Sequence, residues 1–317
     1  MSEFDLIKRY FTRPTPGAVL GVGDDAALLR VGDGMELAVS TDMLVSGTHF
    51  LPDADPFLLG YKTLAVNLSD MAAMGALPCW VTLAIALPSA DEDWLRHFSD
   101  GFFALADQFG IELIGGDTTR GPLNLSVTIM GEVPRGKALR RDGAQAGDDI
   151  WVSGTLGDAA LGLAHLQGKT VLPDDIRERC LAALQQPQPR IALGMALRGI
   201  AHSAIDISDG LLADLGHILE RSHVGAEIKY DKLPVSTSFG GKDMDALRQR
   251  CALSGGDEYE LCFTAADTQR DEIESAAYRL QLPLTRIGKI VSGSGCKVRA
   301  ADGSVMQIER SGYDHFA

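Results

Sequence analysis

The sequence predicts a two-domain α/β protein, and three observations lead to this fold class. The chain has 317 residues, and at roughly 150 residues per domain such a length corresponds to about two domains. Short β-like runs alternate with longer amphipathic helical runs, as in mixed α/β folds. A polar, glycine- and charge-rich stretch over 134–149 interrupts this alternation and is the best candidate for a domain junction. We therefore expect an N-terminal domain over 1–136, with a mixed sheet and helices, and a C-terminal α/β domain over 137–317.

The first half is predicted to begin with a strand over Leu37–Ser40 that ends at Thr41-Asp42. Asp55-Pro56 then favours a helix start, because Asp suits the N-cap and Pro the first helical position, and the apolar spacing carries this helix to about Met74. The next elements, in order, are a strand over 80–87, a helix over 91–109, a strand over 111–114 that stops at Gly115-Gly116-Asp117, and a half-buried alternating strand over 123–133.

The second half repeats the alternation after the junction. A strand over 203–207 is predicted to run into Ser208-Asp209-Gly210 and then into a helix that ends near Ser222. The other expected elements are a strand over 149–153, a helix over 158–167, two proline-punctuated helices up to about 200, and strands near 225–230, 259–264, 284–290 and 296–299.

Composition excludes several classes of function. Acidic residues number 43 against 29 basic ones, which gives a net charge of −14. Such a surface repels phosphodiester backbones and anionic lipid, so we expect neither a nucleic-acid-binding nor a membrane-binding protein. The longest apolar run, over 79–87, is far shorter than the ~20 residues that span a bilayer. Residues 1–11 lack the apolar core of a secretory signal, and five scattered cysteines suit a reducing compartment, which together predict a cytoplasmic protein.

The acidic residues are strongly biased towards Asp, with 30 Asp against 13 Glu, and glycine is abundant at 35 residues. Asp is typical of caps, turns and metal sites rather than helix surfaces. Asp70 lies on the apolar face of the predicted helix over 55–74. Burying this many carboxylates together would require cations to neutralise them. Five further segments place Asp beside glycine or at a strand end: Gly23-Asp24-Asp25, Ser40-Thr41-Asp42, Gly115-Gly116-Asp117, Asp206-Ile207-Ser208-Asp209-Gly210 and Gly255-Gly256-Asp257-Glu258.

An oxygen-only set of ligands points to hard cations, and to Mg²⁺ if phosphates share the coordination. Ca²⁺ is the rival ion, but the chain has no twelve-residue EF-hand loop. The standard phosphate loop is also missing, because Gly162 lies one position too far from Gly168-Lys169-Thr170. Many carboxylates without that lysine favour phosphoryl transfer in which several Mg²⁺ ions take the place of side-chain cations.

Eight ordered motifs cover essentially the whole chain, and they resemble those of the bacterial thiamine-monophosphate kinase family. That family belongs with aminoimidazole ribonucleotide synthetase, selenophosphate synthetase and the hydrogenase-maturation ATPase in one superfamily with a shared ATP-binding plan. The motifs are Gly23-Asp24-Asp25-Ala26-Ala27, Ser40-Thr41-Asp42, Asn67-Leu68-Ser69-Asp70-Met71-Ala72-Ala73-Met74-Gly75-Ala76, Gly115-Gly116-Asp117-Thr118-Thr119, Arg141-Asp142-Gly143-Ala144, Asp206-Ile207-Ser208-Asp209-Gly210-Leu211, Ser254-Gly255-Gly256 and Gly312-Tyr313-Asp314.

The resemblance implies an aminoimidazole ribonucleotide synthetase-like fold and a Mg²⁺-dependent homodimer that transfers the γ-phosphate of ATP to thiamine monophosphate. It implies that Mg²⁺ ligands are Asp25, Ser40, Thr41, Asp42, Asp70, Asp117 and Asp206, with Asp209 on a further ion, and that Asp42, Asp70 and Asp117 are the catalytic residues. It implies ATP contacts from Gly116, Asp117, Arg141 and Ser208, and a thiamine-phosphate pocket with His49, Asp257 and Tyr313. The family usually has Glu-Asp-Tyr where this chain has Asp257-Glu258-Tyr259, so which of the two acids meets the substrate stays open.

This chemistry agrees with the residues present. The acceptor is already a phosphate anion, so direct in-line transfer needs no general base, and a dense Mg²⁺ site would bring two polyanions together. The number of ions and a requirement for a monovalent cation such as K⁺ stay open. Three alternatives remain: another ATP-dependent synthetase of the superfamily, a non-catalytic nucleotide- or metal-binding regulator, and a Mg²⁺-dependent phosphatase. Selenophosphate synthesis is disfavoured, because it needs a reactive cysteine near the N-terminus and the first cysteine is Cys79.

Overall fold

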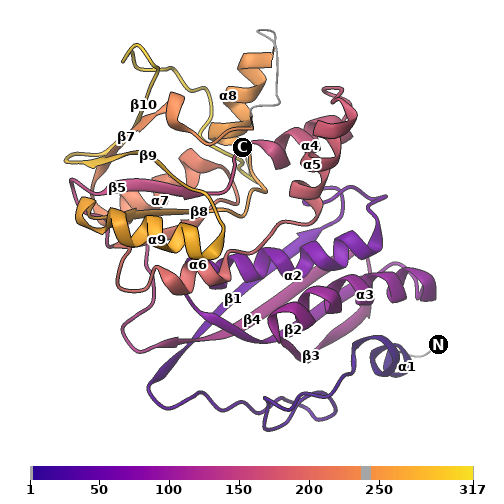
Figure 1. Ribbon diagram of the computed structural model, residues 1–317. Helices are drawn as coiled ribbons and strands as arrows, with labels where there is room; N and C mark the ends of the chain where they lie inside the picture. Colours follow the sequence, from indigo (N-terminus) through magenta and orange to yellow (C-terminus); the bar gives the residue numbers. More distant parts are fainter. Residues whose placement is uncertain (1–2, 237–243, 317) are drawn as a thin grey trace. The chain divides into compact units, whose positions relative to one another are not determined.

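The computed structural model describes residues 3–236 and 244–316, and the chain divides into two compact units (Figure 1). Unit 1 comprises Met1–Met71 and Ala76–Gly136, and unit 2 comprises Ala72–Gly75 and Lys137–Ala317. Each unit has its own mixed sheet with helices, so the predicted two-domain α/β fold class is confirmed. In the described ranges no helix combines the length and the apolar character that crossing a membrane requires.

Unit 1 is built on a four-stranded sheet with the strand order β1-β4-β2-β3. Neighbouring strands are antiparallel except for β2 and β3, which are parallel. The edge strands β1 and β3 are therefore separated by two central strands. The elements of this unit are α1 (Glu3–Leu6), η1 (Ile7–Phe11), β1 (Met35–Val45), α2 (Pro56–Ala73), β2 (Leu77–Leu87), α3 (Glu92–Phe109), β3 (Glu112–Arg120) and β4 (Asn124–Pro134).

Helices α2 and α3 pack closely against each other, and two glycines make this approach feasible. A Cβ atom on Gly60 would lie 2.0 Å from the carbonyl oxygen of Phe98, and one on Gly101 would lie 1.9 Å from that of Phe57. Any larger residue would push the helices apart, so glycine is required by packing at both positions. The core beside them is formed by fully buried side chains, among them Leu64, Leu68, Phe98, Phe102, Leu125 and Ile129.

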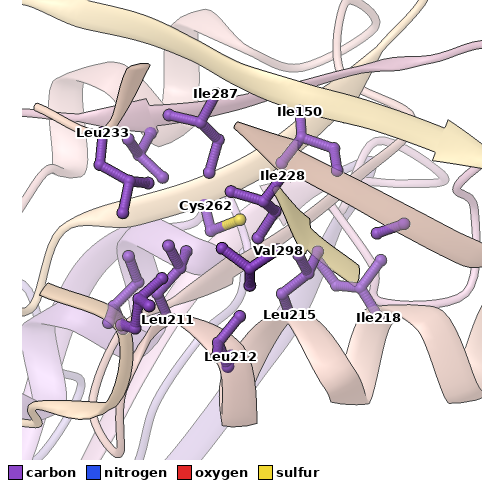
Figure 2. Close-up of a cluster of buried hydrophobic side chains, with 14 of the residues drawn as sticks. Ile150, Leu211, Leu212, Leu215, Ile218, Ile228, Leu233, Cys262, Ile287 and Val298 are labelled. Carbon is purple, nitrogen blue, oxygen red and sulfur yellow. The ribbon is translucent and has the colours of Figure 1, made fainter. Parts of the chain in front are cut away.

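Unit 2 is built on a six-stranded sheet with the order β10-β7-β9-β5-β8-β6, in which only β10 and β7 are parallel. Helix α7 packs its apolar face on this sheet, and Figure 2 shows Leu211, Leu215 and Ile218 of α7 beside Ile150 and Val298 of the strands. The elements are β5 (Asp149–Ser153), α4 (Asp158–Leu166), α5 (Asp174–Gln185), α6 (Ile191–Ala196), β6 (Ser203–Asp206), α7 (Leu211–Ser222), β7 (Gly225–Lys229), η2 (Tyr230–Lys232), α8 (Asp245–Ser254), β8 (Leu261–Ala265), η4 (Asp267–Gln269), α9 (Arg270–Leu280), β9 (Leu284–Val291) and β10 (Gly295–Arg299).

Three expectations from the sequence differ from the structure. The strand predicted over Leu37–Ser40 does not end at Thr41-Asp42 but continues as β1 to Val45, because β4 pairs with it along that whole length. The strand predicted over 111–114 does not stop at Gly115-Gly116-Asp117 but continues as β3 to Arg120, because Thr82–Leu87 of β2 pairs with it along that whole length. Helices α8 and α9 were not predicted, since at least half of the residues of each are polar and α9 buries only Ile273 and Ala276. The other predicted strands and helices are present, with ends that differ by a few residues.

Candidate functional site

In unit 1, helix α2 and strand β1 bring together Ser40, Asp42 and Asp70. The Ser40 hydroxyl donates a hydrogen bond to Oδ2 of Asp70 at 2.5 Å, and the backbone N–H of Asp42 donates to Oδ1 of Asn67 at 3.2 Å. Ser40 and Asp42 share one face of β1 because side chains alternate along a strand. Thr41 therefore points to the other face, where its hydroxyl lies 2.9 Å from that of Thr128 on β4. Asn67 was not predicted as a site residue, although it lies within one of the recognised motifs.

Gly116 and Asp117 lie inside strand β3, at the opposite edge of the sheet from β1. A Cβ atom on Gly116 would lie only 1.9 Å from the carbonyl oxygen of Leu83, so no other residue fits there. The strand register places Asp42, Val127, Leu83 and Gly116 in one row across the sheet. Three strand spacings of about 4.8 Å each put β1 and β3 roughly 14 Å apart along that row. One ion therefore cannot bind directly to both Asp42 and Asp117 of the same chain.

The remaining predicted residues of unit 1 lie in connecting segments. Asp25 is exposed in the segment that precedes β1. His49 follows β1, and its Nδ1 accepts a hydrogen bond from the backbone N–H of Val45 at 3.0 Å. Because Nδ1 acts as an acceptor, the neutral His49 ring carries its proton on Nε2.

In unit 2, the segment Asp206–Gly210 joins the end of β6 to the start of α7 and collects most of the predicted residues of this unit. The backbone N–H of Asp257 donates to the carbonyl oxygen of Ser208 at 2.8 Å, and that of Tyr313 donates to the carbonyl oxygen of Asp209 at 3.0 Å. These bonds bring together a predicted ATP contact, a predicted metal ligand and two predicted substrate residues. Asp206, the fifth member, is buried at the end of β6.

The electrostatics of this segment favour a bound cation. Burial raises the pKa of Asp209, and the nearby carboxylates of Asp257 and Asp314 raise it further, against the opposing effect of His315 and His217. A carboxylate whose charge is disfavoured in this way is stabilised when a cation binds beside it. The geometry therefore suits the predicted role of Asp209.

Asp257 and Glu258 point to different surroundings. Glu258 turns to the start of α4, where its Oε1 accepts a hydrogen bond from the backbone N–H of Gly157 at 2.9 Å. Asp257 lies near enough to Asp209 to influence its pKa, and its Oδ1 accepts a hydrogen bond from the Tyr259 hydroxyl at 3.2 Å. Asp257 and Tyr259 both have positive φ, at 66° and 51°, which is unusual outside glycine and marks a constrained loop. Of the two acids, Asp257 is thus the one beside the other predicted site residues.

Arg141, the last predicted ATP contact, has an exposed side chain and a fixed backbone. The hydroxyl of Ser222 donates to the carbonyl oxygen of Arg141 at 2.9 Å and accepts from the N–H of Ala144 at 3.1 Å. Ser222 thus holds the Arg141–Ala144 turn against the end of α7, although no pattern in the sequence indicates this contact.

The residues fit Mg²⁺ as a partly protein-bound ion. Among residues 3–236 and 244–316, no three His, Cys, Asp or Glu side chains cluster closely enough to hold a metal ion by themselves. Mg²⁺ is usually bound by one or two carboxylates, with water and substrate phosphates completing its shell. The all-oxygen pair of Ser40 and Asp70, and the single carboxylates of Asp42, Asp117 and Asp209, suit that mode of binding.

The fold and these segments define the class of AIR synthase related proteins. The model of the AIR synthase related protein N-terminal domain matches residues 23–133, and that of the C-terminal domain matches residues 145–301. Curated thiamine-monophosphate kinases are similar along the whole chain. That of Salmonella typhimurium is 48% identical, with 99% of this chain and 98% of the relative covered. That of Haemophilus influenzae is 47% identical, with 100% and 98% covered.

Solved structures agree with this assignment. The crystal structure of thiamine-monophosphate kinase from Stenotrophomonas maltophilia K279a is 54% identical, has a TM-score of 0.86, and covers 96% of this chain and 98% of its own. AaThiL complexed with AMPPCP and TMP is 31% identical, with a TM-score of 0.77 and coverage of 99% and 96%. The chain belongs to the thiamine-monophosphate kinase family, as its motifs implied, and it is an enzyme of that family.

Proposed function

We propose that this enzyme transfers the γ-phosphate of ATP to thiamine monophosphate, giving thiamine diphosphate and ADP. The observation that carries the proposal is the full-length similarity to thiamine-monophosphate kinases, at 48% identity over 99% of the chain. The relative AaThiL was solved with AMPPCP and TMP, which correspond to a nucleotide and an acceptor. The clustering of Ser208, Asp209, Asp257 and Tyr313 around one segment supports a site that takes both.

Direct in-line transfer is the reaction course that these residues favour. An oxygen of the acceptor phosphate forms a bond to the γ-phosphorus while the bond from that phosphorus to the bridging oxygen breaks, and ADP leaves with the electron pair. The acceptor phosphate is deprotonated near neutral pH, so no side chain has to remove a proton. The main task of the protein is to hold two polyanions in line and to balance their charge.

The proposed roles follow those that the family resemblance implied. Bound Mg²⁺ supplies charge neutralisation along the phosphates. Asp42, Asp70 and Asp117 are proposed as the carboxylates next to the reacting phosphates. The other proposed metal ligands are Asp25, Ser40, Asp206 and Asp209; Thr41, which the resemblance also implied, has its side chain on the opposite face of β1, beside Thr128. Gly116, Arg141 and Ser208 are proposed to contact ATP, and His49, Asp257 and Tyr313 to contact thiamine monophosphate, whose positively charged ring suits the Asp257 carboxylate.

A homodimer is the proposed working form, and β1 is its proposed interface. On the face of β1 opposite Ser40 and Asp42, three apolar side chains are exposed: Leu37 at 42%, Val39 at 57% and Met43 at 53%. A row of apolar side chains on an edge strand favours association with another chain. Val39→Asp should therefore shift the protein from dimer to monomer in sedimentation experiments, and an unchanged dimer would remove β1 from the interface.

The cytoplasm is the proposed location of the enzyme. All five cysteines are free thiols in the structure, which suits a reducing compartment. ATP as co-substrate points to the same place.

One assay tests the proposed function. The protein is incubated with ATP, Mg²⁺ and thiamine monophosphate, and thiamine diphosphate and ADP are measured together, with thiamine as a control acceptor. We expect the two products in equal amounts and no product from thiamine. The absence of thiamine diphosphate at high enzyme concentration would refute the kinase. Formation of ADP with free phosphate would instead favour a phosphatase. The absence of any ATP turnover would favour a non-catalytic binding protein.

A further inference from the structure

A buried carboxylate fixes the segment that carries Ser208 and Asp209. Asp214 lies in the first turn of α7, and the residue is only 3% exposed. Its Oδ2 accepts hydrogen bonds from three successive backbone N–H groups, those of Ser208, Asp209 and Gly210, at 3.0, 3.1 and 3.1 Å. Successive N–H groups that converge on one point form an anion-binding concavity. Here an anion of the chain itself fills that concavity.

The same segment is also held from its other side. While its N–H groups point to Asp214, the carbonyl oxygens of Ser208 and Asp209 accept from the N–H groups of Asp257 and Tyr313. Gly210 adds a constraint, because its φ is 131° and a Cβ atom there would lie 2.8 Å from the carbonyl carbon of Ser254. The peptide groups of this segment therefore link Asp214 to two proposed substrate residues.

We propose that Asp214 is a positioning residue for phosphoryl transfer, which sets the places of the Ser208 hydroxyl and the Asp209 carboxylate. This inference rests on the proposed function for the roles of Ser208 and Asp209. It carries a consequence for ATP binding. Because Asp214 already accepts from all three N–H groups, the segment meets the nucleotide through the Ser208 side chain and through the cation at Asp209, and not through its backbone amides.

Three variants test the proposal: Asp214→Ala, Asp214→Asn and, as a matched control, Leu215→Ala. Leu215 is the neighbouring residue of α7, is fully buried in the core, and is shown in Figure 2. Its truncation lowers stability without touching the Ser208–Gly210 amides. Asn keeps one oxygen that can accept from those amides, whereas Ala removes the acceptor.

The kinetic readouts are kcat/KM for ATP and the Mg²⁺ concentration that gives half the maximal rate. We expect Asp214→Ala to lower kcat/KM about 100-fold and to raise the half-activating Mg²⁺ concentration about 10-fold. Asp214→Asn should recover most of both losses, with kcat/KM within about 10-fold of wild type and the half-activating Mg²⁺ concentration within about threefold. Leu215→Ala should stay within about threefold of wild type below its melting temperature. A loss in Leu215→Ala as large as that in Asp214→Ala would overturn the proposal, because general destabilisation would then explain both.

Hydrogen exchange of the Ser208, Asp209 and Gly210 amides gives a readout that does not depend on turnover. These amides should be protected in the wild type and in Leu215→Ala, and should exchange at least 10-fold faster in Asp214→Ala. Equal protection in Asp214→Ala would overturn the positioning role, even in an active kinase. Protected amides in a wild-type protein that makes no thiamine diphosphate, with faster exchange in Asp214→Ala, would instead refute the proposed function and leave the Asp214 contact intact. If Asp214→Ala does not fold, Asp214→Asn decides: it should lower kcat/KM for ATP more than Leu215→Ala does, and an equal or smaller loss would overturn the proposal.

Discussion

Glu258 offers a prediction that separates the two neighbouring acids of the Asp257-Glu258 pair. Glu258→Ala should lower the free energy of unfolding by about 2–4 kcal/mol, whereas Glu258→Gln should stay within about 1 kcal/mol of wild type. The reason is the hydrogen bond that Oε1 of Glu258 accepts from the backbone N–H of Gly157 at 2.9 Å. Gln keeps an oxygen in that place, and Ala does not.

The size of the expected loss in unfolding free energy follows from the hydrogen bonding at the start of helix α4. Gly157 is the N-cap residue of this helix and has no side chain with which to satisfy the free N–H groups of the first turn. Leaving its own N–H unpaired costs about 1–3 kcal/mol, and the lost contacts of the truncated side chain add about 1 kcal/mol. The sum is the 2–4 kcal/mol expected for Ala.

The sign of the pH dependence is fixed by the environment of Glu258. Burial raises the pKa of Glu258 well above its usual value, and the negative charges of Asp158 and Glu260 add to this effect. The folded protein therefore keeps the Glu258 proton at pH values where the unfolded chain, with a pKa of about 4.3, has lost it. Wild-type stability should fall as the pH rises from about 4.3 through the folded-state pKa, and then level off. Glu258→Gln lacks this group, so its stability relative to wild type should rise over the same interval.

Urea unfolding at pH 5 and pH 8, followed by circular dichroism, measures these differences. Glu178→Gln on α5 is the matched control, because Glu178 is exposed and the substitution is the same. In the kinase assay, Asp257→Asn should raise the KM for thiamine monophosphate, and Glu258→Gln should leave it nearly unchanged. The reasoning is refuted if Glu258→Gln is as destabilising as Glu258→Ala, or if it raises the acceptor KM more than Asp257→Asn does.

The remaining predictions concern the metal site, the acceptor pocket and a buried ion pair. Asp42→Asn and Asp117→Asn should each lower kcat at least 100-fold in the kinase assay and leave the melting temperature unchanged in scanning fluorimetry. A near-wild-type rate in either variant would remove the substituted residue from the metal site. His49→Ala should raise the KM for thiamine monophosphate more than that for ATP, and an unchanged acceptor KM would exclude it from the pocket. Asp149→Asn should cost about 1–3 kcal/mol at pH 7, a discounted value because the Arg270 partner at 2.6 Å is partly exposed. Burial raises the pKa of Asp149, but hydrogen bonds from Arg270 and Lys289 outweigh burial and keep this pKa low. In urea titrations, the difference in unfolding free energy between wild type and Asp149→Asn should therefore shrink below about pH 3.9.

The fold class could be predicted from the sequence because hydrophobic periodicity, and the residues that begin or end helices and strands, are local signals. The start of α2 is an example, since Asp55-Pro56 stands where the helix begins at Pro56. The end of β3 could not be read in this way. Gly115-Gly116-Asp117 has the composition of a turn, yet the segment remains in the sheet because β2 provides partners for it. Pairing between distant segments decides such a boundary, and no local pattern records it.

The candidate site was predictable as a set of residue types but not as an arrangement. The glycine-aspartate segments were visible as motifs, whereas the contacts of Ser208 and Asp209 with Asp257 and Tyr313 run between backbone groups far apart in the chain. Hydrogen bonds between backbone groups do not require particular residue types at their two ends, so the sequence does not reveal them. Asp214 is different, because an acid in the first turn of a helix after Ser-Asp-Gly is a recognisable capping signal. That signal could have identified the residue before the structure did.

The structure also changes the argument that the aspartates need metal ions because they are buried. The deeply buried carboxylates have protein partners: Asp149 pairs with Arg270 and Lys289, and Asp214 with three backbone amides. Of the six aspartates proposed as metal ligands, only Asp206 is fully buried; Asp25 and Asp117 are exposed, and Asp42, Asp70 and Asp209 are intermediate. The fold of each unit thus does not depend on cations to neutralise these acids. The proposed requirement for Mg²⁺ comes instead from the phosphates that must approach them. It follows that removing Mg²⁺ should abolish transfer but leave the melting temperature of the ligand-free enzyme almost unchanged.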